Sequence, residues 1–273
     1  MNMRKLSALL LLIYFIFPNI VFPQTLIMGY RETGRLPLIG KDGDNSGLYF
    51  DLFSSAAQKL NVNFKIYRYP KKRVLKYIEE GKIDFYPGFT FTPRRAQFAY
   101  YIKNGLLDGG DIGVSLHSLE SITNLEQLKN KRVLLALGGP MVDLLAHIDG
   151  VILNKVASLS IEKAIRLLRL KRHDIYLYNR KSIEYYLKVN NIKDIKLHLK
   201  CCGGNKPMYL GFSRKSINFK ESKNPNYDSK KAIFINNTPT IINKESLAYR
   251  LGLTLKQMRK SGEIQKIIDK YYK

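Results

Sequence analysis

The alternation of apolar runs and amphipathic segments along the chain constrains its fold more than any other feature. An early helical segment carries its apolar residues on one face, with Asp51 placed to cap it: Leu52, Phe53, Ala56, Ala57 and Leu60. Buried-type strands are indicated over 132–137 and 174–178, and a helical segment follows each of them. Before the first of these strands, Thr123-x-x-Glu126 has the spacing of a capping box. Strand and helix alternate in two successive blocks, which predicts an α/β protein with largely parallel sheets.

The first residues of the chain have the pattern of an export signal. Met1–Lys5 carries two positive charges, and an apolar run over 6–17 ends at Pro18. This run is shorter than the about 20 residues that span a bilayer, but it suits the core of a secretory signal. We therefore predict a signal peptide over 1–24 and a periplasmic protein. The lack of a small-x-small cleavage pattern leaves an uncleaved anchor open.

The cysteines, histidines and glycine patterns exclude several chemistries. Cys201 and Cys202 are adjacent and the four histidines are scattered, so we expect no metal site. The sequence has no Walker-type, GxGxxG or GxSxG motif, so neither a bound nucleotide cofactor nor hydrolase chemistry is expected. Two interpretations of the cysteine pair stay open, a disulfide between the two residues and two buried thiols.

The chain is strongly basic, with 46 Lys+Arg against 22 Asp+Glu and a formal net charge of +24. The basic residues are spread along the chain without the pattern of a nucleic-acid-binding motif, so we expect no nucleic-acid partner. The charge favours electrostatic contact with an anionic membrane surface, or steering of anionic ligands toward the protein. A lysine-rich proteome is the alternative explanation.

Two local motifs carry a resemblance to a known family. Gly81-Lys-Ile-Asp84 and Thr90-Phe-Thr-Pro-Arg-Arg95, with the aromatic stretch that follows, resemble the signature of the family 3 extracellular solute-binding proteins. These are the amino-acid-type binding proteins of bacterial ABC importers. Further likeness to that family lies in the segments 124–133, 206–215 and 258–272. The resemblance covers nearly all of the chain after the signal, except 216–244.

The resemblance implies a two-lobed periplasmic-binding-protein-like fold of type II. Each lobe would be a mostly parallel sheet flanked by helices, and two crossover strands would join the lobes. The implied boundaries are lobe 1 over 25–111, lobe 2 over 112–209, and a return to lobe 1 over 210–273 that closes with a helix. The Asn- and Lys-rich segment 216–244 is either a long surface insertion or a partly disordered loop.

By the same resemblance, lobe 1 supplies an anion site. Arg95 matches the family arginine that grips a ligand carboxylate, a role that suits the planar guanidinium. Thr90 falls where a hydroxyl or amide donates to the same group, and Gly88 falls where the backbone approaches the ligand closely. The plain alternative is that Arg94 and Arg95 are two solvated charges in a basic protein.

In lobe 2, the resemblance points to one turn and one side chain. The Gly138-Gly139 turn would present free amides to an anion, although Pro140 removes one of them, and a simple strand-to-helix turn explains the pattern equally well. Asn179 stands where amino-acid-binding members have an aspartate that pairs with the ligand ammonium. The uncharged Asn179 therefore disfavours an ordinary α-amino acid. If the alignment is shifted, Asn179 merely caps the following helix.

Aromatic and basic residues complete the candidate site. Tyr30 and Tyr69 are candidate walls of the cleft, because aromatic rings offer a ligand a large rigid surface. Lys72 and Arg73 resemble a basic stretch found in one subgroup of the family. Ordinary packing and solvated charge are the alternatives.

Together these features predict a monomeric, non-enzymatic receptor. It would capture a small anionic or polar solute, a carboxylate or amino-acid-like molecule, for an ABC importer or a signalling partner such as a sensor kinase. One alternative is an exported enzyme resembling the cyclic-acid dehydratases on this scaffold, with Glu32, Asp108 or Asp111 as its acid. The other is a basic surface-interaction protein that uses the 216–244 segment.

Overall fold

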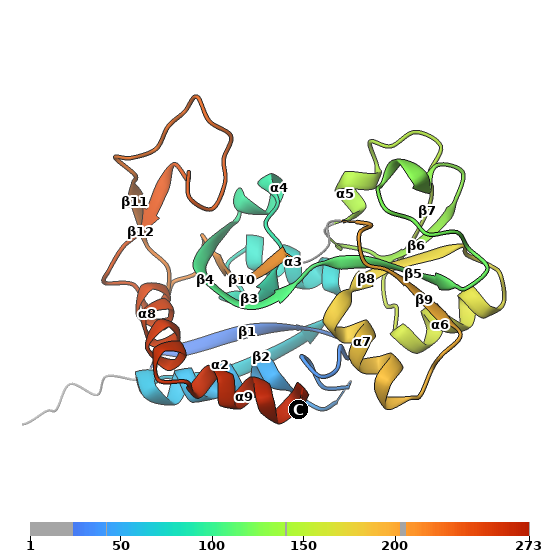
Figure 1. Ribbon diagram of the computed structural model, residues 1–273. Coiled ribbons are helices and arrows are strands. Elements are labelled where there is room, and N and C mark those ends of the chain that lie inside the picture. Colours follow the sequence, from blue (N-terminus) through green and yellow to red (C-terminus); the bar gives the residue numbers. More distant parts are fainter. Residues whose placement is uncertain (1–23, 42, 140, 203–205, 273) are drawn as a thin grey trace, which may run out of the picture.

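The computed structural model describes residues 24–41, 43–139, 141–202 and 206–272 (Figure 1). Residues 1–23 of the predicted signal peptide lie outside these ranges, as does Pro140. Within the described residues, no helix combines the length and the apolar composition that a membrane span requires.

Lobe 1 is built on a five-stranded sheet flanked by helices. Its strands are β1 (Thr25–Arg31), β2 (Asn63–Tyr69), β3 (Phe85–Phe89), β4 (Ala99–Gly109) and β10 (Lys206–Ser213). Its helices are α2 (Leu48–Leu60), α3 (Lys71–Glu79), α4 (Pro93–Ala96), α8 (Leu247–Lys260) and α9 (Glu263–Tyr272). The strand order is β2-β1-β3-β10-β4; the first three strands run parallel, and β10 is antiparallel to both of its neighbours.

Lobe 2 repeats this plan on a second five-stranded sheet, in the order β7-β6-β8-β5-β9. Its strands are β5 (Asp111–Leu116), β6 (Arg132–Ala136), β7 (Ile152–Val156), β8 (Ile175–Asn179) and β9 (Ile195–His198). Its helices are the 3₁₀ turn η1 (Glu126–Leu128), α5 (Met141–Leu145), α6 (Ile161–Arg169) and α7 (Arg180–Val189). Strands β7, β6 and β8 run parallel, and β5 is antiparallel to β8 and β9.

The two sheets form separate lobes with separate apolar cores (Figure 1). The chain passes from lobe 1 to lobe 2 between β4 and β5, where Gly110 adopts a φ of +125° that favours glycine. It returns between β9 and β10. The predicted two-lobed α/β architecture is confirmed.

In the motif Gly81-Lys-Ile-Asp84, the aspartate holds parts of lobe 1 together. Asp84 is 4% exposed; its Oδ2 accepts a hydrogen bond of 2.6 Å from the Ile27 amide of β1, and its Oδ1 accepts one from the Ser216 hydroxyl. Burial raises the pKa of Asp84, and these hydrogen bonds oppose the rise. The carboxylate thus joins β1 to the segment that follows β10.

The segment 216–244 contains a short hairpin, β11 (Glu221–Lys223) paired with β12 (Thr240–Ile242). It projects from the lobe 1 end of the molecule, away from lobe 2 (Figure 1). Phe234 anchors the intervening loop by packing against Phe91, with 5.1 Å between ring centroids. The Asn- and Lys-rich composition had not indicated these strands.

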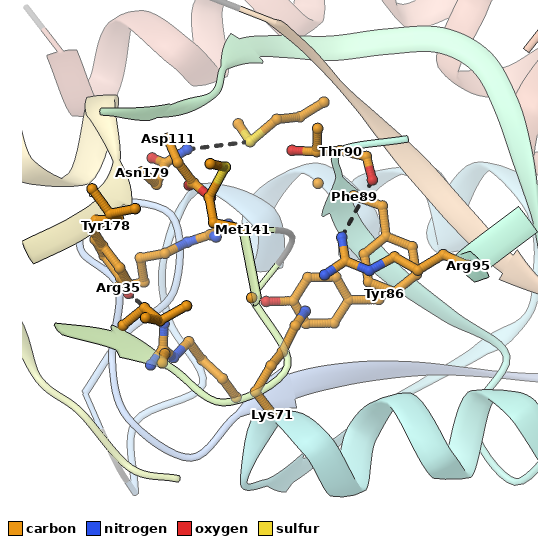
Figure 2. A pocket seen from close by; sticks show the side chains of 17 residues that line it. Arg35, Lys71, Tyr86, Phe89, Thr90, Arg95, Asp111, Met141, Tyr178 and Asn179 are labelled. Carbon is orange, nitrogen blue, oxygen red and sulfur yellow. Dashed lines mark hydrogen bonds between the residues drawn. The ribbon is translucent and has the colours of Figure 1, made fainter. Parts of the chain in front are cut away.

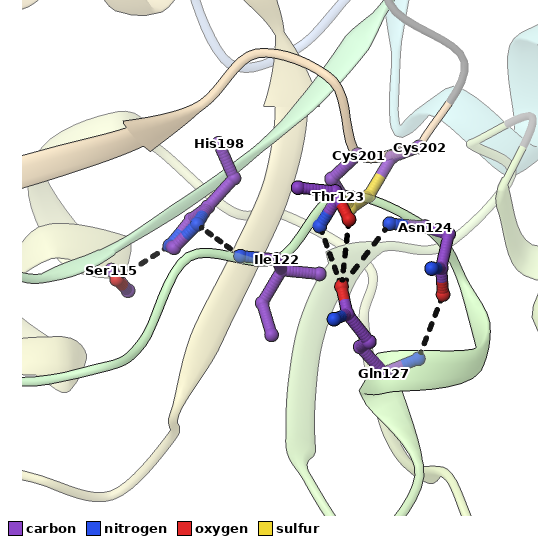
Figure 3. Close-up of a disulfide and its surroundings, with 8 residues drawn as sticks. All are labelled: Ser115, Ile122, Thr123, Asn124, Gln127, His198, Cys201 and Cys202. Carbon is purple, nitrogen blue, oxygen red and sulfur yellow. Dashed lines mark hydrogen bonds between the residues drawn. A yellow bond between two sulfur atoms is a disulfide. The ribbon is translucent and has the colours of Figure 1, made fainter.

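Two local expectations about helix caps are wrong. Helix α2 begins at Leu48 with Gly47 as its N-cap, so Asp51 lies inside the first turn, where it accepts a hydrogen bond of 2.6 Å from Lys270. Near η1, Gln127 replaces Glu126 as the reciprocal partner: its Oε1 accepts from the Thr123 amide at 2.7 Å, and its own amide donates to Asn124 Oδ1 at 3.2 Å (Figure 3).

Cys201 and Cys202 form a disulfide with each other, and both are buried in the lobe 2 core (Figure 3). His198 lies close to this pair in the chain and holds together β5, β9 and the loop before η1. Its Nδ1 accepts from the Ile122 amide at 2.9 Å, so its Nε2 carries the proton and donates to Ser115 Oγ at 2.8 Å. Burial lowers the pKa of His198, in agreement with a neutral ring.

Candidate ligand-binding site

A cavity of about 60 Å³ lies between the lobes (Figure 2). Its walls come from the carboxyl ends of parallel strands in both sheets: Arg31 ends β1, Phe89 ends β3, Ala136 ends β6 and Asn179 ends β8. Ligands of open α/β sheets characteristically bind at this edge, because the loops that leave the strands converge there.

Positive side chains dominate the cavity. Among the described residues that line it are Arg31, Arg35, Lys71 and Arg95, against the single carboxylate of Asp111. The formal charge of the lining is therefore +3. A low-dielectric pocket with this excess attracts an anion strongly.

Arg95 is held in place on both sides of the cavity. Helix α4 starts with Thr92 as N-cap, whose hydroxyl accepts from the Arg95 amide at 3.2 Å. Arg95 is 6% exposed, and its guanidinium donates to the Thr90 carbonyl at 3.3 Å and to the Gly138 carbonyl of lobe 2 at 2.9 Å. Burial lowers the pKa of Arg95, yet a guanidinium stays charged at physiological pH.

Arg31 also reaches from lobe 1 to lobe 2. It donates to the Tyr178 hydroxyl, to the Leu159 carbonyl at 3.2 Å and to the Thr33 hydroxyl at 2.8 Å. Its guanidinium also lies over the Tyr178 ring, 5.4 Å from the centroid. This arginine is satisfied by protein partners and ties the two lobes together.

Lys71 and Arg35 are different: Lys71 lies against aromatic rings, and two nitrogen atoms of Arg35 are buried without a hydrogen-bond partner in the described chain. The Lys71 ammonium lies 2.9 Å from the Tyr86 ring centroid and 4.9 Å from that of Phe89. Loss of solvent, followed by the charges of Arg95, Arg35 and Arg31, holds the pKa of Lys71 well below its usual value. In Arg35, Nε and Nη2 are buried without a hydrogen-bond partner in the described chain.

Two predicted lobe 1 residues line the cavity together with Arg95. Gly88 has a φ of +74°, and a Cβ there would collide with the Tyr49 hydroxyl, so only glycine fits. The carbonyl of Thr90 accepts from Arg95 and, at 3.2 Å, from the Tyr101 hydroxyl.

In lobe 2, Gly139 and Asn179 line the cavity as well. The Gly139 amide is not free, because it donates to the Ala136 carbonyl at 3.0 Å within the turn. Asn179 is the N-cap of α7: its Oδ1 accepts from the Ser182 amide at 3.2 Å, and it is 4% exposed. Asn179 therefore caps α7 and lines the cavity at the same time.

The remaining candidates lie elsewhere. Tyr30 is fully buried in the lobe 1 core, and Tyr69 packs edge-on against Tyr77, with 4.9 Å between the ring centroids; neither is among the described residues that line the cavity. Lys72 lines an adjoining groove of about 420 Å³, which also contains Arg94 and shares Arg95 with the cavity. Of the candidate acids, Asp111 lines the cavity, Glu32 accepts a 3.5 Å hydrogen bond from Ser158, and the Asp108 side chain is outside the description.

The sequence analysis missed Arg31, Arg35 and Lys71. A signal existed for Lys71: it precedes the buried Val74 and Ile78 by three and seven residues, so all three share one face of α3. Lys72 is rotated by about 100° onto an exposed face. Arg31 could have been found as the last residue of a strand, at the edge where ligands bind.

Comparisons with known proteins agree with this architecture. The chain matches the family model of bacterial extracellular solute-binding proteins, family 3, over residues 26–273. An ancestral arginine-binding protein bound to arginine is 22% identical, with a TM-score of 0.69 over 92% of this chain and 100% of that one. The GluR0 ligand-binding core in complex with L-glutamate is 14% identical, with a TM-score of 0.68 over 93% and 100%.

A third similar solved structure is an ancestral binding protein described as the precursor of an enzyme. The ancestral amino acid-binding protein AncCDT-1, a precursor of cyclohexadienyl dehydratase, is 18% identical, with a TM-score of 0.66 over 91% of this chain and 96% of that one. No curated protein matches the sequence. At these identities the solved structures show the shared fold, whereas the family model spans nearly the whole chain. The chain therefore belongs to the bacterial extracellular solute-binding proteins, family 3.

Proposed function

We propose that this protein captures a small anionic solute in the cavity between its lobes and delivers it to an ABC importer. Proteins of this family bind small molecules and work with ABC transporters. The observation that carries the proposal is the excess of Arg31, Arg35, Lys71 and Arg95 over Asp111 around the cavity. A bound anion would supply the missing counter-charge.

The interlobe contacts explain how capture would work. Arg31 and Arg95 of lobe 1 already donate to Tyr178 and Gly138 of lobe 2, and the exposed Arg94 forms an ion pair with Asp143 at 2.9 Å. A ligand that touches both lobes stabilises the closed arrangement by its higher affinity for that state.

The lobe 2 wall disfavours an ordinary α-amino acid. Such a ligand carries an ammonium, which needs an anionic partner once it is out of water. Asn179 offers no charge, and Asp111 is surrounded by cations whose charges it partly offsets, as its effect on Lys71 shows. The proposal is therefore a carboxylate or another anion without a compensating positive charge.

Native mass spectrometry of the purified protein tests the proposal directly. We expect a copurifying small anion that is retained in the folded protein and lost on unfolding. A cationic or zwitterionic amino acid in its place would overturn the anionic assignment.

Arg95→Ala should weaken binding of that anion by about 2–5 kcal/mol, because the arginine is buried at the cavity wall. Its neighbour Arg94 is the matched control: it is exposed and its pair with Asp143 is screened, so Arg94→Ala should cost no more than about 1 kcal/mol. Isothermal titration calorimetry measures both. Equal affinities for the two variants would remove Arg95 from the site.

A further inference from the structure

We infer that the cavity takes a compact dianion, a small molecule with two negative charges, and that Arg35 and Lys71 form a second anion subsite in the same cavity as Arg95. The inference rests on the proposed function and narrows its ligand class. Figure 2 shows Arg35 and Arg95 on opposite sides of the cavity, with Lys71 between them.

Arg35 is the first part of this subsite. The residue is 9% exposed, and two of its nitrogen atoms are buried without a hydrogen-bond partner in the described chain. The backbone around it is fixed, because the Arg35 amide donates to the Ile39 carbonyl at 2.9 Å and its carbonyl accepts from Leu38 and Ile39. A buried guanidinium with unused donors is costly unless an acceptor arrives, and a planar anion is the acceptor that fits its fork.

Lys71 is the second part. The faces of Tyr86 and Phe89 stabilise its positive charge but accept none of its N–H groups in the ordinary sense. Arg95, Arg35 and Arg31 are close enough to act on its charge. An anion placed among these four cations would relieve their mutual repulsion and accept hydrogen bonds from Lys71 at once.

The other two cations are already engaged. Arg31 donates to Thr33, Tyr178 and Leu159, so it contributes charge but few free donors. Two N–H groups of Arg95 donate to backbone carbonyls, and its remaining N–H groups can bind one anionic group. One carboxylate at Arg95 would leave the donors of Arg35 and Lys71 unused, whereas a ligand with two anionic groups would use both sets.

Charge and size point to the same class. The formal charge of the cavity lining is +3. With a bound monoanion the total formal charge of lining and ligand would be +2, and with a bound dianion it would be +1. The cavity volume of about 60 Å³ has room for a few water molecules, which suits a compact solute. A short dicarboxylate and a phosphoryl oxyanion share this chemistry.

Calorimetric titration of the purified full-length protein distinguishes these cases, after unfolding and oxidative refolding have removed any retained ligand. The probes are malonate for the dicarboxylate, inorganic phosphate for the phosphoryl oxyanion, and propionate as the monoanion matched to malonate in carbon number. We expect malonate, phosphate or both to bind about 100-fold more tightly than propionate.

Lys71→Met and Arg35→Gln should each weaken malonate and phosphate binding much more than propionate binding, which reduces this preference to about tenfold or less. Lys65→Met, which removes the same charge from the exposed edge strand β2, is the matched control and should keep the preference. Thermal unfolding establishes that each variant is folded; if Arg35→Gln is not, Lys71→Met alone decides. A preference that survives in Lys71→Met overturns the subsite.

The two proposals fail in different ways. If propionate binds as tightly as malonate and phosphate, the dianion inference is wrong while anion capture stands. If none of the three anions binds and a neutral or cationic amino acid does, the proposed function itself is wrong.

Discussion

Lys71 is a residue of the cavity lining whose pKa its surroundings lower well below the usual value. Loss of solvent and three neighbouring arginines lower its pKa, and the carboxylate of Asp111 opposes them. A bound anion would favour the charged ammonium and raise that pKa again. The complex then holds more protons than the free protein at any pH between the two pKa values.

We therefore expect anion binding to take up protons in this range, and affinity to rise as the pH falls toward the pKa of Lys71 in the free protein. Calorimetry in buffers of different ionisation enthalpy measures the proton uptake. Lys71→Met should abolish it. Proton release on binding would show that the sign of the coupling is wrong.

At the scale of an element, the N-cap residue of α7, Asn179, also lines the cavity. Asn179→Asp keeps an oxygen that can accept from the Ser182 amide, so helix stability should hold. The new carboxylate lowers the formal charge of the cavity lining from +3 to +2. We expect weaker anion binding with an almost unchanged melting temperature, measured by titration and by thermal unfolding.

Asn179→Ala gives the complementary result. It removes the cap without adding charge, so it should lower the free energy of unfolding by about 1 kcal/mol. If Asn179→Asp bound the anion as tightly as the unaltered protein, the electrostatic account of this wall would fail.

The junction around Asp84 should matter for stability and not for ligand choice. Asp84→Ala leaves the Ile27 amide and the Ser216 hydroxyl without their shared acceptor inside lobe 1. We expect a loss of about 2–4 kcal/mol in the free energy of unfolding, measured with urea. Asp84 is outside the described lining of the cavity. The folded fraction of the Asp84→Ala protein should therefore keep the same relative affinities for different anions.

The sequence specifies elements better than it specifies which side chain each element presents. Apolar periodicity in α3 and α6 predicts buried faces, and those faces are found. Arg35 has no such signal, because its position depends on a tight loop closed by a bridge to Ile39. Lys71 and Lys72 differ by one residue, yet only the rotation of the folded helix decides which of them enters the cavity.

For the whole molecule, alternation of strands and helices was enough to predict an α/β fold. The lobes and their crossovers came from the resemblance, because strands β5 and β10 join their sheets by long-range antiparallel pairing that no local pattern encodes. The hairpin at β11 and β12 was missed since its three-residue strands are too short to show alternation.

The formal charge of +24 acts on the molecule as a whole. A field of one sign raises the encounter rate of an oppositely charged solute, and salt screens it. We expect the association rate constant for an anionic ligand to fall as ionic strength rises, with a smaller change in the dissociation rate constant. Stopped-flow fluorescence from the cavity tyrosines measures both; a rate of association that is independent of salt would exclude steering.

The positively charged residues around the cavity have a practical consequence for the choice of buffer. If the proposed anion capture is right, a receptor with such a lining would bind oxyanions from growth media, buffers and precipitants. Phosphate- or sulfate-based solutions would fill the cavity before any candidate is added. Screening for the physiological solute should therefore use zwitterionic buffers with chloride as the sole small anion.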